Sequence, residues 1–278
     1  MPFYARVFAV TWLFGRSMAV PTSPCIGAGP SAAAQHNKMR PAMSTPQKVA
    51  VITGASQGIG ASLVRAYRDA GYRVVANSRS IPPSSDPDIL AVAGDISDPK
   101  VAERLIAEAV ERFGRVDTLV NNAGIFTAKP FTDFTAEDWA ANIGTNLGGF
   151  FFVTQAAIRR METQGSGHVV QITTSIVDQP INGVPAVLAS ITKGGLKAAT
   201  QGLAIEYAGR GIRVNAVAPG VIKTPMHPPE THAGLSALHP LGRMGEISEI
   251  VDAVLFLENA QFVTGETVHV DGGQAAGR

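Results

Sequence analysis

Residues 49–60 read VAVITGASQGIG. The first five residues form a continuous apolar, largely β-branched run, which predicts a buried strand over Val49–Thr53. A glycine-rich turn follows, and we expect a helix to begin near Ala61. Glycines at a strand-to-helix turn let the backbone approach a pyrophosphate, and the helix N-terminus offers it free N–H groups. The stretch therefore predicts a nucleotide-binding turn.

After this turn, apolar runs alternate with helical stretches through the rest of the chain. Near-continuous Val, Ile and Ala runs indicate strands that are covered on both faces, as in a parallel sheet. The further strands expected are Arg73–Asn77, Leu90–Ala93, Thr118–Asn121, His168–Thr173, Arg213–Ala218 and Thr267–Val270. The alternation predicts an α/β fold over residues 46–278, a single Rossmann-type, doubly wound parallel sheet with helices on both faces.

Several helix boundaries are marked by their capping residues. Asp98-Pro99 is typical of an N-cap followed by Pro at the first helical position, and predicts a helix through about Phe113. Thr135 to Asp138 is close to a capping box, with Asp in place of Glu. We expect two long helices at about Asp138–Gln164 and Ser190–Gly209.

The connection between the second and third strands is unusually short. Only SIPPSSDPDI, residues 80–89, separates them, and it contains three prolines. A parallel crossover normally needs a dozen or more residues, and proline breaks helices. We therefore expect no crossover helix here and a more open adenine side.

Residues 1–45 differ from the rest of the chain. A short apolar run, VFAVTWLF, follows Arg6, and a Pro/Gly/Ala/Ser stretch without periodicity comes next. A secretory signal, an organellar transit peptide and a translation start at Met43 each fit this pattern. We treat 1–45 as a disordered leader or a mis-assigned start.

Composition excludes several classes of function. A net charge of +1 gives no electrostatic case for nucleic acid. The only cysteine is Cys25, so no intrachain disulfide can form. No apolar run reaches the roughly 18 residues that span a membrane. We expect a cytoplasmic protein that acts on a small molecule and binds neither nucleic acid nor membrane.

Six ordered motifs resemble those of the short-chain dehydrogenase/reductase family, over essentially all of residues 47–278. They are the TGxxxGIG turn, Gly94-Asp95-Ile96, Asn121-Asn122-Ala123-Gly124, Asn146 in TNLGGFFF, the segment Pro219–Thr224, and the closing TG…VDGG. The resemblance implies a nicotinamide cofactor. It also implies its contacts: Gly54, Ser56, Gln57, Gly58, Ile59, Gly60, Ser78, Arg79, Asp95, Ile96, Asn122, Ala123, Gly124, Lys193, Pro219, Gly220, Ile222 and Thr224.

The end of the second strand predicts which cofactor is preferred. An acid there would bind both ribose hydroxyls and repel a 2′-phosphate, but the sequence reads Asn77-Ser78-Arg79. Arg79 can pair with a phosphate and Ser78 can donate a hydrogen bond to it. We expect NADP(H) rather than NAD(H). The alternative is that Arg79 stacks on the adenine or is a solvated loop residue.

The resemblance implies a catalytic set of Asn146, Ser175 and Lys193. In the family a Ser polarises the carbonyl, a Tyr exchanges a proton with the substrate oxygen, and a Lys lowers the pKa of that Tyr. Lys193 in SITKGG matches the family Lys, and Ser175 in ITTS matches the Ser, with Thr174 as the neighbouring candidate.

Ala189 stands four residues before Lys193, where the family has its Tyr. The side chain of alanine has no ionisable group, so proton delivery must differ from that of the family. Candidate substitutes are Ser190 through a water, a desolvated Lys193, the histidines at 227, 232 and 239, and a water held by Asp178 and Gln179. The histidines can equally be polar loop surface, and their spacing predicts no metal site.

Two functions fit the sequence. The first is an NADP(H)-dependent oxidoreductase that moves a hydride between nicotinamide and a carbonyl or alcohol, with non-standard proton delivery. The second is a catalytically silent NADP(H)-binding sensor or scaffold of the same fold. By resemblance we expect a homo-oligomer, a tetramer or a dimer.

Overall fold

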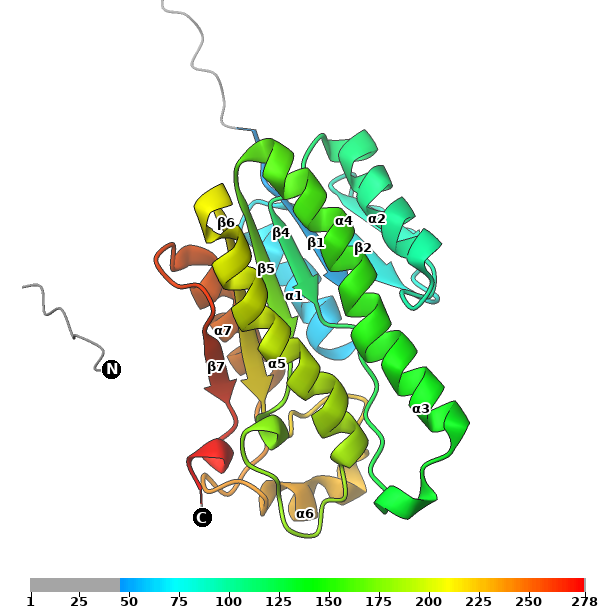
Figure 1. Cartoon of the computed structure of the whole chain (residues 1–278), viewed down its shortest axis with the longest axis vertical. Coiled ribbons are helices and arrows are strands. Elements are labelled where there is room, and N and C mark those ends of the chain that lie inside the picture. The colour runs from blue at the N-terminus through cyan, green and yellow to red at the C-terminus, as the bar shows by residue number, and fades with distance from the viewer. Residues whose placement is uncertain (1–45, 278) are drawn as a thin grey trace, which may run out of the picture. The chain divides into compact units, whose positions relative to one another are not determined.

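In residues 46–277, which the computed structural model describes, seven parallel strands form one sheet (Figure 1). The strands are β1 (Val49–Thr53), β2 (Arg73–Ser78), β3 (Ile89–Ala93), β4 (Thr118–Asn121), β5 (Gly167–Ile172), β6 (Ile212–Pro219) and β7 (Thr267–Val270). Their order is β3-β2-β1-β4-β5-β6-β7, so the chain starts mid-sheet and winds to each edge in turn. The doubly wound Rossmann-type fold is confirmed. The leader expected over 1–45 lies outside the described residues.

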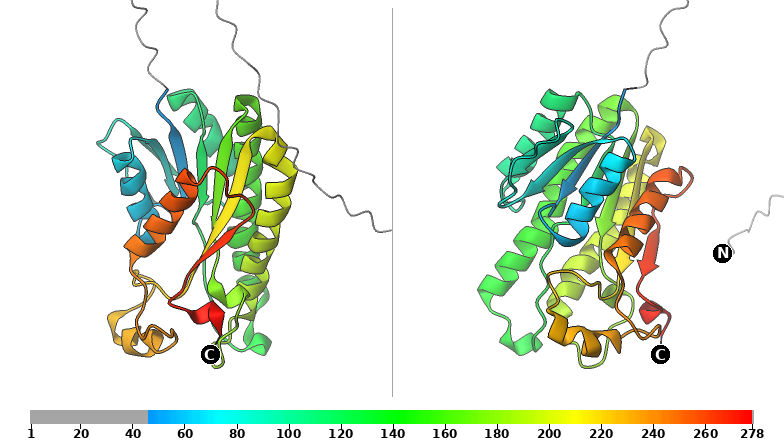
Figure 2. Two further views of the ribbon diagram at one scale, coloured as in Figure 1. Left: turned by 90° about the vertical axis from the view of Figure 1, so that its left-hand side faces the viewer. Right: turned by 180° about the vertical axis from the view of Figure 1, so that it is seen from behind.

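Helices cover both faces of this sheet. Figure 1 shows three of them across the near face: α2 (Pro99–Phe113), α4 (Gly149–Gln164) and α5 (Val187–Tyr207). Figure 2, seen from behind, shows two on the other face: α1 (Gly58–Asp69) and α7 (Ile247–Asn259). Two shorter helices lie outside these layers, α3 (Ala136–Asn142) and α6 (His232–Ser236).

Each face of the sheet has its own apolar core, because successive strand residues point to opposite sides. Val51 of β1 packs in the core that contains Leu105 of α2. The next residue, Ile52, packs in the core that contains Leu63 of α1 and Leu257 of α7. A strand buried on both faces must be apolar at every position, which explains the uninterrupted runs.

The predicted helix caps are present. Asp98 accepts a hydrogen bond from the backbone N–H of Lys100 at 2.9 Å, with Pro99 as the first helical residue. Thr135 and Asp138 form a complete capping box at the start of α3. The expected long helix then runs on through a π-helical segment, residues 143–148, into α4.

No helix lies between β2 and β3 in the described part of the chain, as predicted. The two strands nevertheless pair in parallel. Arg68, in the last turn of α1, holds the connection in place: its guanidinium lies 2.9 Å from Asp86 and 3.0 Å from Asp88. These ion pairs anchor the loop to the helix that precedes it.

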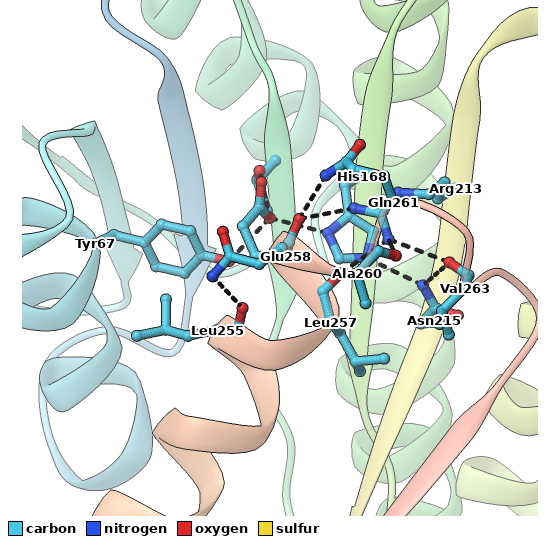
Figure 3. A network of polar contacts seen from close by, with 12 residues as sticks. Tyr67, His168, Arg213, Asn215, Leu255, Leu257, Glu258, Ala260, Gln261 and Val263 are labelled. Atoms are coloured by element: carbon cyan, nitrogen blue, oxygen red, sulfur yellow. Dashed lines mark hydrogen bonds and ion pairs between the residues drawn. The ribbon is translucent and has the colours of Figure 1, made fainter.

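A buried polar network joins α7 to the sheet (Figure 3). Glu258, in the last turn of α7, is 5% exposed. Its carboxylate accepts hydrogen bonds from the hydroxyls of Tyr72 and Thr118, each at 2.9 Å, and from Tyr67 at 3.3 Å. Nδ1 of His168 lies 2.9 Å from the same carboxylate. One side chain thus links α7 to α1, β4 and β5.

Charge in this network is set by the balance of burial and hydrogen bonding. Burial alone would raise the pKa of Glu258, but hydrogen bonds from His168, Tyr72 and Thr118 outweigh it and lower the pKa to about 2. Burial lowers the pKa of His168 below its usual 6.5. The unfolded chain binds protons more readily at both groups, so their contribution to stability is lost as pH falls below about 6.5 and then 4.5.

Replacing the carboxylate should expose this dependence. Glu258→Gln is expected to lower the free energy of unfolding at pH 7 by about 3 kcal/mol, because it leaves buried donors unpaired. It should also flatten the fall in stability between about pH 4.5 and pH 2, the range in which the unfolded chain is protonated at this carboxyl and the folded chain is not. Urea unfolding at several pH values measures both effects, with the exposed Glu103→Gln of α2 as the control. Equal unfolding midpoints for the two variants would contradict this account.

Candidate active site

The C-terminal ends of the strands open onto a cavity of about 860 Å³. Its wall comes from the segments that follow each of the strands β1 to β7, and α6 lies across the same end of the sheet (Figure 2). Strand order reverses between β1 and β4, and a crevice at such a reversal is where doubly wound sheets bind ligands. The topology therefore places the candidate site here.

The turn after β1 lies so close to the turn after β4 that side chains do not fit between them. Gly54 has φ of +65°, and a Cβ there would lie 2.9 Å from Cα of Ala123. A Cβ on Gly60 would lie 2.7 Å from Nδ2 of Asn122, and closer still to the Gly54 carbonyl oxygen. Asn122 bridges the gap, donating to the carbonyl oxygens of Thr53 at 3.0 Å and Gly54 at 3.1 Å. The result is a cradle of backbone atoms.

The start of α1 fits an anion. Its N-cap, Gln57, makes no side-chain capping hydrogen bond, and the first turn contains no acidic residue. Backbone N–H groups at this helix end are therefore unopposed by local negative charge, and the helix dipole adds to their field. Ser56 and Ile59 line the cavity on either side of this start. The cradle and the helix end together suit a diphosphate.

The far end of the cavity, beside β2 and β3, is polar. The Ser78 hydroxyl oxygen is buried and makes no hydrogen bond within residues 46–277. Arg79 is exposed and lines the same wall. Across from them, Asp95 accepts hydrogen bonds from the backbone and hydroxyl of Ser97 at 3.0 and 2.8 Å, and these lower its pKa. A buried hydroxyl without a partner beside an arginine suits a ligand with acceptor oxygens.

Nearly all of the predicted cofactor contacts line this one cavity. Gly60 is the exception, since it lies behind the wall against Gly54 and Asn122. The residues that do line it are Gly54, Ser56, Gln57, Gly58, Ile59, Ser78, Arg79, Asp95, Ile96, Asn122, Ala123, Gly124, Lys193, Pro219, Gly220, Ile222 and Thr224. Residues far apart in the sequence thus share one surface, and the contacts themselves stay a prediction.

Lys193, on α5, lines the cavity. Its Nζ donates to the carbonyl oxygen of Ile172, the last residue of β5, at 2.7 Å, and makes no ion pair within the described residues. Burial without a counter-ion lowers its pKa from 10.5 to about 8. A Cβ at Gly124 would lie 3.0 Å from Nζ, so the glycine provides room for the ammonium group.

Asn146 lies in the π-helical segment, and such segments often occur at functional sites. Its side chain is buried and does not line the cavity. The amide accepts from the N–H of Ile125 at 2.8 Å, donates to the Ile125 carbonyl at 3.0 Å, and donates to Thr192 Oγ1 at 3.1 Å. It therefore ties the segment after β4 to α5, next to Lys193. A direct catalytic role stays a prediction.

Ser175 and Thr174 take different positions at the end of β5. Ser175 is fully buried, and its hydroxyl donates to the carbonyl oxygen of Pro219 at 3.2 Å. Thr174 is partly exposed and lines the cavity, which Ser175 does not. Of the two hydroxyl residues that the sequence offered, Thr174 is the one that lines the cavity, and a catalytic role for Ser175 stays a prediction.

Ala189 precedes Lys193 by one helical turn, so the two residues share a face of α5. It lines the cavity and is 1% exposed. Its side chain is a methyl group, which neither donates nor accepts a proton. Next to the lysine, the wall of the cavity is therefore apolar at this position.

The three histidines of the segment after β6 differ in role. His239 is buried, with Nε2 accepting from the N–H of Val221 at 2.9 Å and Nδ1 donating to the carbonyl of Leu235 at 3.1 Å, a tautomer assigned from these partners. His232 bonds the carbonyl of His227 and does not line the cavity. His227 does line it, and burial lowers its pKa.

Asp178 and Gln179 do not line the cavity, so the expectation that they hold a water there lacks support in the structure. Asp178 instead forms an ion pair with Lys197 of α5 and a hydrogen bond, at 3.0 Å, with His269 of β7. Burial raises its pKa, but these contacts outweigh that effect and lower it. Its role is to join three elements.

Two absences within residues 46–277 bear on other classes of function. No group of three or more His, Cys, Asp or Glu side chains comes together in a way that could hold a metal ion. No helix in this part of the chain is long and apolar enough to cross a membrane.

Comparison with known proteins decides the family. Residues 54–275 match the family model described as enoyl-(acyl carrier protein) reductase. The chain belongs to the short-chain dehydrogenase/reductase family. As a member of this family it is an NAD(P)-dependent oxidoreductase that acts on CH–OH or C=O groups.

Its relatives span nearly the same length. The chain is 37% identical to L-rhamnose 1-dehydrogenase (NAD(P)(+)) of Azotobacter vinelandii over 81% of this chain and 96% of that protein. It is also 37% identical to the 3-oxoacyl-(acyl-carrier-protein) reductase FabG of Escherichia coli, over 83% and 98% of the two chains. Among solved structures, "ElxO with NADP Bound" matches with a TM-score of 0.77 and 30% identity, over 83% of this chain and all of that one.

A second solved structure shows that the cofactor differs among these neighbours. The 3-ketoacyl-(acyl-carrier-protein) reductase from Brucella melitensis, complexed with NADH, matches with a TM-score of 0.77 and 28% identity, over 83% of this chain and all of that one. The comparisons therefore establish a nicotinamide cofactor for this short-chain dehydrogenase/reductase and leave the choice between NADP(H) and NAD(H) to the site itself.

Sequence reasoning missed a group of apolar residues that also line the cavity. They include Phe126 after β4, Ile176 and Ile181 after β5, and Met226 and Leu235 after β6. These residues lie in segments whose sequence has no strand or helix periodicity, so no pattern predicted which way their side chains point. The only signal was the presence of large apolar side chains in segments otherwise rich in Pro, Gly and polar residues.

The glycine cradle gives a direct test of cofactor binding. Gly60→Ala should weaken NADPH binding at least about tenfold, because overpacking of this kind costs about 1–3 kcal/mol and displaces Gly54 or Asn122. Isothermal calorimetry measures the affinity. Gly202→Ala on α5 is the control, since a Cβ there has no heavy atom within 4 Å. Unchanged NADPH affinity in Gly60→Ala would show that the nucleotide does not use this turn.

Proposed function

We propose that the protein is an NADP(H)-dependent short-chain dehydrogenase/reductase in which Lys193 takes over proton delivery. One observation carries the proposal. A single cavity joins the close-packed glycine turn after β1 to a partly buried lysine on α5 that has no counter-ion within residues 46–277. Such an arrangement suits a dinucleotide whose phosphates lie at the cradle and whose reactive ring reaches the lysine.

The preference for NADP(H) rests on the residues that follow β2. No acidic side chain stands there, and Ser78 contributes a buried hydroxyl without a hydrogen-bond partner in the described chain. Arg79 lines the cavity beside it and makes no ion pair within residues 46–277. A 2′-phosphate would give both groups a partner, whereas a free ribose hydroxyl would leave the guanidinium unused.

Removing the Arg79 guanidinium should therefore weaken the binding of NADPH and not that of NADH. Arg79→Ala is expected to raise the Kd for NADPH about tenfold or more, since a charge-assisted hydrogen bond is worth about 1.5–3 kcal/mol, and to leave the Kd for NADH nearly unchanged. Arg65→Ala is the matched control, because Arg65 is exposed on α1 and does not line the cavity. Equal losses for both cofactors would contradict the assignment.

Proton delivery follows from what lines the cavity near α5. When bound, the nicotinamide supplies a hydride to a carbonyl carbon or accepts one from an alcohol carbon. Where the family has a tyrosine, this chain has Ala189. Lys193, with a pKa of about 8, is mostly ammonium at neutral pH and can pass a proton to the carbonyl oxygen. The resulting amine regains its proton from water, and Thr174 can donate a hydrogen bond to the same oxygen.

The pH profile tests this role for Lys193. Carbonyl reduction should lose rate as pH rises through about 8, because the acid form disappears, and alcohol oxidation should gain rate over the same range. Lys193→Gln should lower kcat by about 100-fold or more and remove this pH dependence. NADPH absorbance with a carbonyl panel measures turnover.

Lys197→Gln is the control for this variant, since Lys197 lies one turn further along α5 and pairs with Asp178 outside the cavity. Its pH profile should match that of the unaltered protein. If Lys193→Gln keeps the activity and its pH profile, the proton comes from elsewhere.

A second candidate function is a cofactor-binding sensor or scaffold that does not turn over. The observation in its favour is Ala189, because the group on which proton transfer in the family most depends is missing. Against it stands the retention of Asn146, Lys193 and the complete cavity. Saturable NADPH binding with no turnover on any carbonyl would favour the sensor.

We infer that the protein assembles as a homo-oligomer, a tetramer or a dimer. α4 and α5 lie side by side on the outside of one face of the sheet (Figure 1). Phe151 of α4 is 54% exposed and Ile205 of α5 is 83% exposed. Large apolar side chains exposed on adjoining helices favour a contact with another copy.

A further inference from the structure

Two buried polar groups that line the cavity have no hydrogen-bond partner within residues 46–277. One is the hydroxyl of Ser78, after β2, and the other is the amide nitrogen Nε2 of Gln274, after β7. β2 and β7 lie toward opposite edges of the sheet, so the two groups lie toward opposite ends of the cavity. The proposed 2′-phosphate of the cofactor gives the Ser78 hydroxyl a partner, whereas the Gln274 amide needs another.

The backbone at Gln274 is held in a fixed turn. After β7, Gly272 and Gly273 take positive φ angles of +60° and +89°, and Gln274 begins a short 3₁₀ helix. The Asp271 carboxylate accepts hydrogen bonds from the backbone N–H groups of Gly273 at 3.0 Å and Ala275 at 2.7 Å. These bonds fix the position from which the Gln274 side chain extends.

Neighbouring segments enclose this side chain, which is only 5% exposed. The short helix that Gln274 begins packs against the 3₁₀ turn Ser175–Val177, after β5. At Gly273, the residue before it, a Cβ would lie 3.4 Å from Cβ of Pro240, in the segment after β6. The amide of Gln274 therefore lies within the cavity wall, where bulk water is largely excluded.

A buried amide nitrogen without a partner loses the hydrogen bonds that water would give it, and folded proteins leave few such groups. The nitrogen and oxygen of a glutamine amide exchange places by a half-turn of the amide plane, so the nitrogen can face a ligand in the cavity. An acceptor atom on that ligand would satisfy the Gln274 donor.

Neither a carboxylate nor the cofactor supplies this acceptor. Among the described residues, Asp95 is the one carboxylate that lines the cavity, and it lies after β3, at the adenine end. The cofactor, placed as proposed, has its phosphates at the turn after β1 and its reactive ring at Lys193 of α5. The remaining source of an acceptor is the substrate.

The surroundings determine which kind of acceptor fits. Of the cationic side chains that line the cavity, Arg79 lies at the adenine end and Lys193 faces the reacting oxygen in the proposed mechanism. A carboxylate beside Gln274 would have no cation of its own, and an unpaired buried charge is unfavourable. Ile176 and Leu235 line the same cavity with hydrocarbon. An uncharged oxygen on a mainly apolar chain meets both conditions.

We propose that Gln274 is a specificity-determining residue, whose amide donates a hydrogen bond to a second, uncharged carbonyl oxygen of the substrate. The substrate class is then a mainly apolar ketone that carries an ester or a similar neutral carbonyl in addition to the carbonyl that is reduced. The proposal rests on the proposed function, because it takes the same cavity as the site of hydride transfer.

The first test compares substrates of equal length on the full-length protein with NADPH. Ethyl acetoacetate is compared with 2-heptanone, and ethyl levulinate with 2-octanone, because each ketone replaces the ester group by two methylenes. At least one keto ester should give a kcat/KM about tenfold or more above that of its matched ketone. The free acid levulinate should be reduced at least about tenfold less efficiently than its ethyl ester. Equal kcat/KM values for ester and ketone in both pairs would overturn the proposal.

A variant assigns this preference to the amide. Gln274→Leu keeps the approximate size of the side chain without the donor. It should lower kcat/KM for the preferred keto ester about tenfold, and change that for the matched ketone and the Kd for NADPH less than about twofold. Gln201→Leu is the matched control, because Gln201 is exposed on α5 and does not line the cavity. A raised Kd for NADPH in Gln274→Leu would give the amide to the cofactor instead and overturn the proposal.

Stability separates recognition from a structural role. Removing an unpaired buried donor should leave the urea midpoint of the free protein unchanged or raise it. If the amide instead holds a structural water, Gln274→Leu would lower the midpoint and slow the keto ester and the ketone alike, and the proposal would be wrong.

Calorimetry with NADPH, run first, distinguishes this proposal from the proposed function. Absence of NADPH binding would remove the proposed function itself. Turnover of other carbonyl compounds but of neither keto ester would overturn the role of Gln274 and leave the proposed function in place.

Discussion

The contact between the turn after β1 and the turn after β4 is the constraint on which the rest of the site depends. Thr53 Oγ1 accepts hydrogen bonds from the backbone N–H groups of Asn122 and Ala123, and Asn122 returns two to the β1 turn. These bonds hold the ends of β1 and β4 so close together that a side chain at Gly54 or Gly60 would not fit. The cavity, the free end of α1 and the approach of Lys193 to Gly124 all follow from that spacing.

Elsewhere in the cavity, the important feature is Lys193, which is partly buried and has no anionic partner within the described residues. Nζ of Lys193 has a carbonyl oxygen as its hydrogen-bond partner, so desolvation is uncompensated and the pKa falls to about 8. In a site that contains the family's tyrosine, such a lysine lowers the pKa of that tyrosine. Here Ala189 offers no group to act through, and the same low pKa makes the ammonium itself a usable acid near neutrality.

The site could be predicted from sequence where backbone geometry dictates the residue type. Gly54, Gly60 and Asn122 were predictable because few other residues fit so close a contact. Which of Ser175 and Thr174 lines the cavity was not predictable, because a shift of one residue at a strand end reverses the face to which a side chain points. The different roles of His239 and His227 could not be predicted either, since both lie in one segment without periodicity. Only the hydrogen bonds of His239 to Val221 and Leu235, which depend on the tertiary structure, show that it supports the fold.

If Lys193 is the acid of this site, its side chain must titrate near neutral pH. In protein with isotopically labelled lysine and bound NADP+, the side-chain resonance of Lys193, assigned by its loss in Lys193→Gln, can be followed by NMR against pH. The account predicts a midpoint near pH 8. A midpoint near the usual 10.5 would contradict it, because an ammonium that titrates so high holds its proton too firmly for this role.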